Sequence, residues 1–377
     1  MDNTRRGRLE MYNKNKFKLG LFGPNCSSGR AITKVPERWS GNWSDNLALA
    51  NMAEFYGLDF MLPVGRWKGY GGETNYQGET YETITWATGL LAITKKLTVF
   101  ATVHAPLFHP VIVAKQLVTA DHVGSGRLGL NIVCGWNEGE FRMFGAKQRD
   151  HEARYGHGQE WLDVVKRMWV DDGPFDFSGS HVDLQDLESA PKPLNGGYPL
   201  IMNAGASSTG QEFAVRNCDA LFCTPVGAEN LNQLAKGIET GKKLAADLKR
   251  SVDIYSVGVI TCRPTAAEAK EYHHYCIVES ADWDAVDNIL EMKNVNPRTV
   301  GDEEFKRRRL LQAEGMGGIP IIGDPDTVAE HIIRIAKLGL RGIGVSFVNY
   351  LEELPFFATE VIPRLEKGGL RKPVRVS

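Results

Sequence analysis

Residues 127–141 read Arg-Leu-Gly-Leu-Asn-Ile-Val-Cys-Gly-Trp-Asn-Glu-Gly-Glu-Phe. The first eight are apolar at nearly every position and end at Gly135, which predicts a strand that is buried on both faces. Strands of this kind belong to parallel sheets that helices cover on both sides. One polar side chain, Asn131, stands in the middle of the predicted strand.

Asn131 has to find a hydrogen-bond partner inside the protein. Side chains alternate along a strand, so Asn131 shares a face with Gly129 and Val133. A buried amide without a partner costs about 1–3 kcal/mol. Two interpretations remain open: an asparagine satisfied by its neighbours in the core, or one near the C-terminal end of a barrel strand that meets a planar polar ligand. Glu140 follows in the predicted loop, where α/β folds carry their chemistry.

The composition is that of a globular protein. The chain has 377 residues, of which 42% are hydrophobic and 24% charged, and its net charge is −2. That charge predicts no nucleic-acid partner and no anionic membrane surface. We find no signal peptide and no run of about 18 apolar residues, so we expect no secretion and no membrane span. The six cysteines show neither paired nor metal-ligand spacing, which favours free thiols in a reducing cytoplasm.

Strands and helices alternate along the chain without a break in composition. Together they predict one parallel (β/α)₈ barrel domain over residues 1–377, with a doubly wound sheet as the alternative. Residues 1–15 are expected to be a loose arm, and 264–320 a mostly helical insertion before the last strand. The eight predicted strands are 17–24, 58–63, 97–103, 127–134, 200–204, 219–224, 252–262 and 342–347. The predicted helices include about 44–56, 80–93, 110–123, 228–248 and 326–338, together with a long helix that ends near 170.

The segment 203–210 has the order strand, small residues, helix start. Free backbone N–H groups there, with the hydroxyls of Ser207 and Ser208, suit a phosphate group. Arg154 and Tyr155 on the preceding helix could reach the same phosphate. Ordinary serine capping of the helix is the alternative.

Three further side chains follow predicted strand ends. His104 comes after the third strand and could contact a ligand or serve in the core. Trp67 and Trp136 come after the second and fourth strands, where they could form the wall of a pocket above a flat cofactor or pack in the core. The nine histidines lack any metal-ligand spacing, so no metal site is predicted.

With these residues assembled, the chain resembles the bacterial-luciferase-like flavin monooxygenases. Within them it is most similar to the branch of the pyrimidine oxygenase, the dimethyl sulfone monooxygenase and the nitrilotriacetate monooxygenase. The resemblance runs from about Phe17 to Arg364. It rests on Asn131-Ile-Val-Cys-Gly-Trp136 with Glu140, on Asp150-His-Glu-Ala-Arg154-Tyr155, on Asn203-Ala-Gly-Ala-Ser207 and on Arg66-Trp-Lys-Gly-Tyr-Gly-Gly72.

The resemblance implies a TIM-like barrel that binds FMN in its reduced form, FMNH₂, and uses O₂. It also implies roles for single residues. Thr102, Asn131 and Glu140 would be the catalytic residues, with Thr102 beside the face that reacts with O₂. The cofactor-binding residues would be Gly65, Arg66, Thr102, Asn131, Glu140, Arg154, Tyr155, Ser207 and Ser208, and the substrate pocket would include Trp67, His104 and Trp136.

The function implied by the resemblance is a two-component monooxygenase that cleaves a C–N, amide or C–S bond in a small molecule. A separate NAD(P)H:flavin reductase would supply FMNH₂, and the chain would form a homodimer or homotetramer. A deazaflavin-dependent dehydrogenase on the same fold and a non-catalytic flavin-binding protein are the alternatives. The segments Pro63-Val64 and His104-Ala-Pro-Leu match no single relative closely, so the resemblance does not identify the substrate.

Overall fold

The computed structural model describes residues 10–194, 197–205, 207–222 and 229–373. The chain divides into two compact units. Unit 1 comprises Met1–Asn13, Glu82–Phe222 and Gly241–Asp253. Unit 2 comprises Lys14–Tyr81, Cys223–Thr240 and Ile254–Ser377. Within the described ranges, none of the helices combines the length and the apolar composition that crossing a membrane requires.

Four parallel strands form the sheet of unit 1. Their order is β3 (Thr98–His104), β4 (Leu128–Val133), β7 (Leu200–Asn203) and β8 (Ala220–Phe222). Every residue of β3 is buried, as expected for a strand covered on both faces. The register pairs Thr102 with Asn131 and Ile132 with Asn203, so the polar residues of three strands lie near one end of the sheet.

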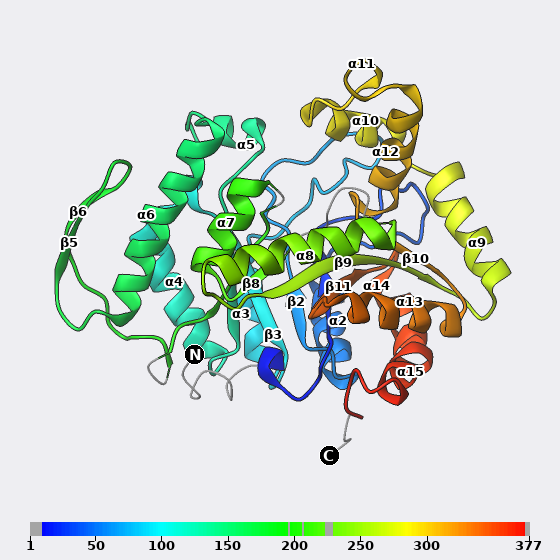
Figure 1. Cartoon of the computed structure of the whole chain (residues 1–377), viewed down its shortest axis with the longest axis horizontal. Helices are drawn as coiled ribbons and strands as arrows, with labels where there is room; N and C mark the ends of the chain where they lie inside the picture. Colours follow the sequence, from blue (N-terminus) through cyan, green and yellow to red (C-terminus); the bar gives the residue numbers. More distant parts are fainter. Residues whose placement is uncertain (1–9, 195–196, 206, 223–228, 374–377) are drawn as a thin grey trace. The chain divides into compact units, whose positions relative to one another are not determined.

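Helices follow the strands of unit 1 in the chain. The central ones are α3 (Thr83–Ile93), α4 (Pro110–Val123), the short α5 (Glu138–Met143), α6 (His151–Val170) and α7 (Ser208–Asn217). Helix α8 (Leu231–Asp247) follows β8 in the chain, and only its residues from Gly241 onward belong to unit 1. An antiparallel hairpin of β5 (Phe175–Ser178) and β6 (Asp183–Leu187) lies beyond α6, on the side away from α7 (Figure 1).

Glu160 of α6 holds this hairpin. Its carboxylate accepts hydrogen bonds from the backbone N–H groups of Ser180, His181 and Val182, at 2.8, 2.7 and 2.9 Å. Burial raises the pKa of Glu160, but these three donors outweigh that effect and the pKa lies below its ordinary value. The ionised carboxylate is therefore the form that stabilises the folded hairpin.

Replacing Glu160 with glutamine is expected to lower the melting temperature at pH 7. The pKa of Glu160 is depressed in the folded protein, so its stabilisation is present above the ordinary pKa of about 4.5 and is lost as the pH falls through the folded value. The difference between wild type and variant should therefore shrink as the pH is lowered below about 4. Thermal unfolding at several pH values measures this difference. The exposed Glu188→Gln is the control, and a deficit that is independent of pH would contradict the assignment.

Five parallel strands form the sheet of unit 2. Their order is β10 (Ile319–Gly323), β9 (Asp253–Cys262), β11 (Gly342–Ser346), β1 (Lys18–Phe22) and β2 (Phe60–Leu62). The helices of this unit outside the insertion include α2 (Trp43–Phe55), α13 (Pro325–Leu338), α14 (Tyr350–Phe356) and α15 (Ile362–Lys367). The Phe60 ring covers Gly20, because a Cβ at Gly20 would stand 2.4 Å from it.

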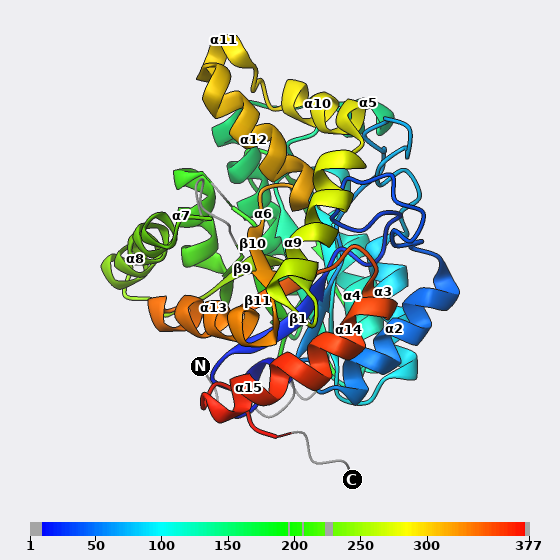
Figure 2. The same cartoon turned by 90° about the vertical axis from the view of Figure 1, so that its right-hand side faces the viewer.

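A helical insertion separates β9 from β10. It comprises α9 (Ala266–His274), the π-helical turn η4 (Tyr275–Glu279), α10 (Trp283–Met292), α11 (Pro297–Val300) and α12 (Asp302–Gly315). Figure 2 shows α10, α11 and α12 gathered together beyond α9. A second hydrophobic core joins these helices to the loops after β1 and β2, through residues such as Ile32, Tyr76, Ile277, Ile289 and Ala313.

All eight predicted strands are present, and three features differ from the prediction. The sequence analysis missed strand β10, which begins Ile319-Pro320. Proline argues against a strand except at the edge of a sheet, and β10 is at the edge of its sheet. Glu140 lies on helix α5 rather than in a loop. Asn137 caps that helix, because its side chain accepts a hydrogen bond from the N–H of Gly139. The sequence did not predict the helix because glycine within it lowers the helix propensity of this stretch. Residues Glu10–Tyr12 of the expected loose arm form a 3₁₀ turn.

Candidate functional site

Asn131 and Thr102 form a buried pair at the centre of the unit 1 sheet. The two residues are register partners on β4 and β3, and both are almost completely buried. Asn131 Nδ2 donates to Thr102 Oγ1 at 3.2 Å, and the backbone carbonyl of Thr102 accepts from Thr83 Oγ1 at 2.7 Å. The sequence analysis placed both side chains in the candidate site, and the structure brings them together.

The amide of Asn131 is satisfied at one end only. Its Oδ1 atom is buried and has no hydrogen-bond partner among the described residues. Rotating the amide by half a turn would exchange the two ends, because the Thr102 hydroxyl can donate as well as accept. In either orientation, one polar atom of the Asn131 amide has no hydrogen-bond partner among the described residues, so a bound molecule could hydrogen-bond to it.

A second asparagine on the neighbouring strand shows the same pattern. Asn203 on β7 donates through Nδ2 to the carbonyl of Ile132 at 2.6 Å. Its orientation is unambiguous, because a carbonyl can only accept. The Oδ1 atom of Asn203 is therefore the end that lacks a partner within the described part of the chain, and the residue is 2% exposed. Adjacent strands thus present two unsatisfied, buried amide ends.

His104 and Glu140 lie near the same end of the sheet. The Nε2 atom of His104 is 4.0 Å from Glu140 Oε2, and both side chains are buried. His104 is the last residue of β3, and Glu140 is presented by the short helix α5. A carboxylate and an imidazole at this distance are too far apart for a direct hydrogen bond, but both can orient a polar ligand placed between or beside them.

A second polar group forms where α6 meets the start of α7. It consists of His151, Tyr155, Ser207 and Gly210 and is called the Tyr155 cluster below. The Tyr155 hydroxyl lies close enough to the Ser207 side chain for the two groups to interact electrostatically. Ser207 Oγ also accepts the N–H of Gly210 at 3.1 Å and lies 3.0 Å from His151 Nε2. The Tyr155 ring lies between those of His151 and Phe213, at centroid distances of 5.2 and 5.6 Å.

Glycine at position 210 lets the Tyr155 hydroxyl reach the start of α7. A Cβ there would stand 2.4 Å from the tyrosine oxygen and 2.9 Å from the Cα of Gly205. Burial raises the pKa of Tyr155 above its ordinary value, so the hydroxyl keeps its proton and can donate it in a hydrogen bond. The cluster therefore offers a hydroxyl donor beside a helix N-terminus, an arrangement that suits an anion.

Ser207 has the capping role considered from the sequence, and its contact with a phosphate stays a prediction. It caps α7, and it belongs to the Tyr155 cluster. A hydroxyl can donate one hydrogen bond and accept two, and Gly210 and His151 already use two of these three places on Ser207. A phosphate oxygen that took the Ser207 proton would displace one neighbour, and His151 at the exposed rim is the easiest to move.

Arg154 supports the end of β4. Its Nη1 atom donates to the backbone carbonyl of Gly135 at 2.5 Å. The neighbouring Cys134 packs against Gly158 of α6, where a Cβ would stand 2.6 Å from its sulfur. Burial raises the pKa of Cys134 to about 12, so this cysteine remains a neutral thiol. We therefore assign it a packing role.

The structure places the remaining predicted residues as follows. Trp136 is partly exposed, and its carbonyl accepts from Gln148 Nε2 at 3.0 Å. Ser208 is exposed in the first turn of α7. Gly65, Arg66 and Trp67 belong to unit 2, after β2. There the Arg66 guanidinium lies over the ring of Tyr70 at 4.5 Å.

Three residues of the candidate site were not singled out from the sequence: His151, Asn203 and Gly210. Asn203 could have been found, since it is a polar residue at the end of a buried strand, as Asn131 is. His151 and Gly210 could not, because their roles depend on how α6 packs beside α7.

The chain matches the family model described as luciferase-like monooxygenase over residues 17–342. It is 30% identical to the FMNH₂-dependent dimethylsulfone monooxygenase of Pseudomonas putida, over 92% of this chain and 94% of that protein. It is 27% identical to the pyrimidine monooxygenase RutA of Acinetobacter baylyi, again over 92% and 94%. Among solved structures, the long-chain alkane monooxygenase LadA superposes with a TM-score of 0.85 at 17% identity, over 97% of this chain and 94% of that one. That likeness shows the fold and confirms the predicted (β/α)₈ barrel.

Proposed function

The chain belongs to the luciferase-like monooxygenase family, and from that premise we propose that it is an FMNH₂-dependent enzyme that transfers one atom of O₂ to a small organic molecule. The observation that carries the proposal is the half-satisfied amide of Asn131, buried beside Thr102. The names of the two relatives, one FMNH₂-dependent and both monooxygenases, support FMN and O₂ over the deazaflavin-dependent and non-catalytic alternatives.

The residues of unit 1 fit FMN at two places. The flavin ring and ribityl chain carry N–H and O–H donors, which the unpaired Oδ1 atoms of Asn131 and Asn203 need. The terminal phosphate fits the Tyr155 cluster, where a hydroxyl donor stands beside the first N–H groups of α7. Tyr155, Ser207 and His151 would hold the phosphate there, while Arg154 acts as a positive charge close by.

Reduced FMN, when bound, supplies the electrons that reduce O₂, so that one oxygen atom reaches the substrate and the other leaves as water. The protein has to position and shield this chemistry. Asn131 and Thr102 orient the ring and direct O₂ towards it. Glu140 and His104 lie 4.0 Å apart and orient the substrate, and the buried β3 and β4 exclude water from that side.

The proposal includes a separate NAD(P)H:flavin reductase, in keeping with a relative that depends on FMNH₂. It also includes a homodimer or homotetramer in the cytoplasm. The five cysteines of the described residues are free and buried, which suits a reducing compartment.

Gly65, Arg66 and Trp67 keep their predicted roles as flavin and substrate contacts on the strength of the resemblance alone.

Photochemically reduced FMN and the protein, mixed with ¹⁸O₂, are expected to convert one member of a panel of sulfones, sulfonates and uracils. Mass spectrometry should find one ¹⁸O atom in the product. Under argon, NADH without a reductase should leave the visible flavin band unchanged. A protein that oxidised its substrate without consuming O₂ would instead be a dehydrogenase, and rapid bleaching by NADH alone would remove the need for a reductase.

A further inference from the structure

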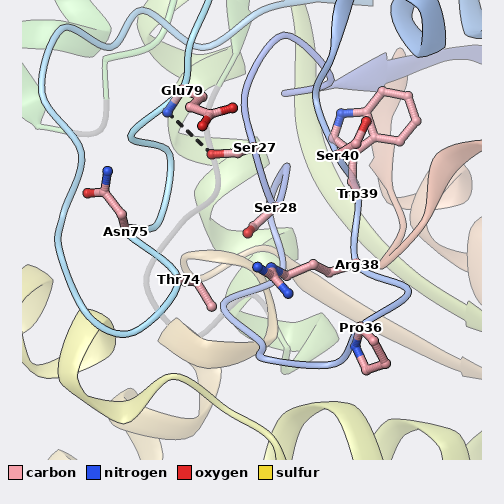
Figure 3. A pocket seen from close by; sticks show the side chains of 9 residues that line it. All are labelled: Ser27, Ser28, Pro36, Arg38, Trp39, Ser40, Thr74, Asn75 and Glu79. Atoms are coloured by element: carbon pink, nitrogen blue, oxygen red, sulfur yellow. Dashed lines mark hydrogen bonds between the residues drawn. The ribbon is translucent and has the colours of Figure 1, made fainter.

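A polar pocket of about 330 Å³ opens between two loops of unit 2. One wall is formed by residues 27–40, which follow β1, and the other by residues 74–79, which follow β2. None of its lining residues is among those proposed above to contact the flavin or its substrate. Figure 3 shows the guanidinium of Arg38 and the hydroxyl of Ser28 directed into the space between the loops, with Glu79 beside Ser27.

The two loops are held firmly enough to keep the pocket open. Thr74 donates to Asp282 through both its N–H and its hydroxyl, at 2.8 and 2.7 Å. Ser27 N–H donates to the carbonyl of Glu79 at 2.8 Å, and Ser28 N–H donates to that of Trp39 at 2.9 Å. Trp39 N–H also donates to the carbonyl of Val348 at 2.9 Å, so each loop is tied both to the other and to the rest of unit 2.

Ser28 is the first sign that the pocket binds something. Its hydroxyl is buried, with the residue 1% exposed, and has no hydrogen-bond partner among the described residues. Its backbone is also in the left-handed region at φ +61°, which glycine adopts far more readily than serine. A strained serine with an unsatisfied, buried hydroxyl calls for a polar partner in this wall of the pocket, either a ligand group or an ordered water that a ligand would contact.

The two charged residues of the pocket, Arg38 and Glu79, are the second sign that the pocket binds a ligand. Arg38 donates only to the carbonyl of Val35 at 3.3 Å, and its remaining N–H groups have no partner in the described part of the chain. The Glu79 carboxylate is exposed to solvent; it accepts no hydrogen bond from the described residues and does not pair with Arg38. The other charges nearby are already engaged: Lys34 pairs with Glu73 at 3.2 Å, and Asp282 accepts from Thr74.

We propose that this pocket binds a small zwitterion, an amino acid or an aminosulfonate. Its carboxylate or sulfonate contacts Arg38 and the Ser28 hydroxyl, and its ammonium group contacts Glu79. An anion without a cationic group would leave Glu79 to water alone, and a cation alone would leave Arg38 to water. A ligand that carries both charges satisfies the two residues and the buried hydroxyl together.

Isothermal titration calorimetry on the purified full chain tests the proposal. The probes are glycine, β-alanine, γ-aminobutyrate and taurine, with acetate and ethylamine as half-ligands. At least one zwitterion is expected to bind with one-to-one stoichiometry and at least about tenfold more tightly than either half-ligand, because it forms two charge-assisted contacts in place of one. Acetate binding as tightly as every zwitterion would overturn the proposal, as would the absence of binding by all probes.

Substitutions distinguish the two ends of the ligand. Arg38→Gln should weaken the zwitterion and acetate alike by about tenfold or more, and Arg38→Lys should weaken them less. Glu79→Gln should weaken the zwitterion by a similar factor but strengthen acetate, since it removes a like charge. A Glu79→Gln variant with unchanged affinities would overturn the proposal. Thermal unfolding of each variant verifies that it is folded.

Ser28→Gly tests the hydroxyl without introducing strain, because glycine accepts the positive φ. It should weaken the zwitterion severalfold while the melting temperature stays level or rises. Ser125→Gly is the matched control: Ser125 also has a positive φ, of +51°, but is exposed in unit 1. Equal binding by both serine variants would exclude the Ser28 hydroxyl as a contact. All of these measurements are made without flavin, so they do not depend on the proposed monooxygenase activity.

Discussion

Replacing Asn131 with alanine is expected to lower product formation by about 10²–10³-fold, the usual loss for a positioned hydrogen-bonding group. The side chain pairs with Thr102 through one end of its amide, and in the proposed function the other end contacts the flavin. The Tyr155 cluster is unchanged in this variant, so FMN affinity should fall only modestly. Reduced flavin would still react with O₂, and the electrons should then appear as hydrogen peroxide. The measurement is the ratio of peroxide to product in single turnovers.

The control for this variant is Asn46→Ala. Asn46 is also fully buried, and its amide donates to the carbonyls of Gly41 and Asn42 at 3.0 and 2.8 Å. Its loss should lower the melting temperature and leave the peroxide-to-product ratio unchanged. If Asn131→Ala behaves in the same way, its amide is only a structural group and the proposed flavin contact is wrong.

Replacing Gly210 with alanine is expected to weaken FMN binding by about 30- to 1000-fold. The new methyl group would stand 2.4 Å from the Tyr155 hydroxyl, which has to move away from the start of α7. Losing one or two charge-assisted hydrogen bonds to the phosphate corresponds to about 2–4 kcal/mol. Calorimetric titration with FMN and with riboflavin measures the effect, since only FMN carries the phosphate.

Two comparisons make the Gly210→Ala result specific. Riboflavin affinity should be the same in wild type and variant, so the preference for FMN should nearly disappear. Gly173→Ala should change neither affinity, because a Cβ at Gly173 meets nothing within 4 Å. An equal loss of riboflavin and FMN affinity would indicate a general distortion of the site and would argue against a phosphate at the Tyr155 cluster.

The strands of this protein could be predicted because their signal is local. Buried parallel strands such as β3 and β4 are short apolar runs between turn residues, and a reader of the sequence needs no tertiary information to find them. Helix α5 could not be found in this way. It has six residues and a glycine, so its helical propensity is low, and the Asn137 cap and the burial of Phe141 hold it in place.

In the candidate site, too, the residues that local sequence reveals could be predicted, and those that depend on tertiary packing could not. Asn131 was identifiable because a polar residue inside an apolar run needs an explanation, and the pairing with Thr102 follows from strand register. The contact of Arg154 with the Gly135 carbonyl was not predictable, since it depends on the angle at which α6 passes the end of β4. Periodicity shows which face of an element is buried but not which neighbouring atom a long side chain meets.

The second core has a consequence for how relatives of this chain diverge. It ties together parts that are far apart in sequence: the loop that contains Ile32, the loop that contains Tyr76, and the insertion from α9 to α12. Close packing makes a change of volume in one of them felt by the others. Those two loops also form the walls of the 330 Å³ pocket. Natural selection for a new ligand there would therefore act on a correlated set of positions rather than on single sites, while the strands of the sheet could remain as they are.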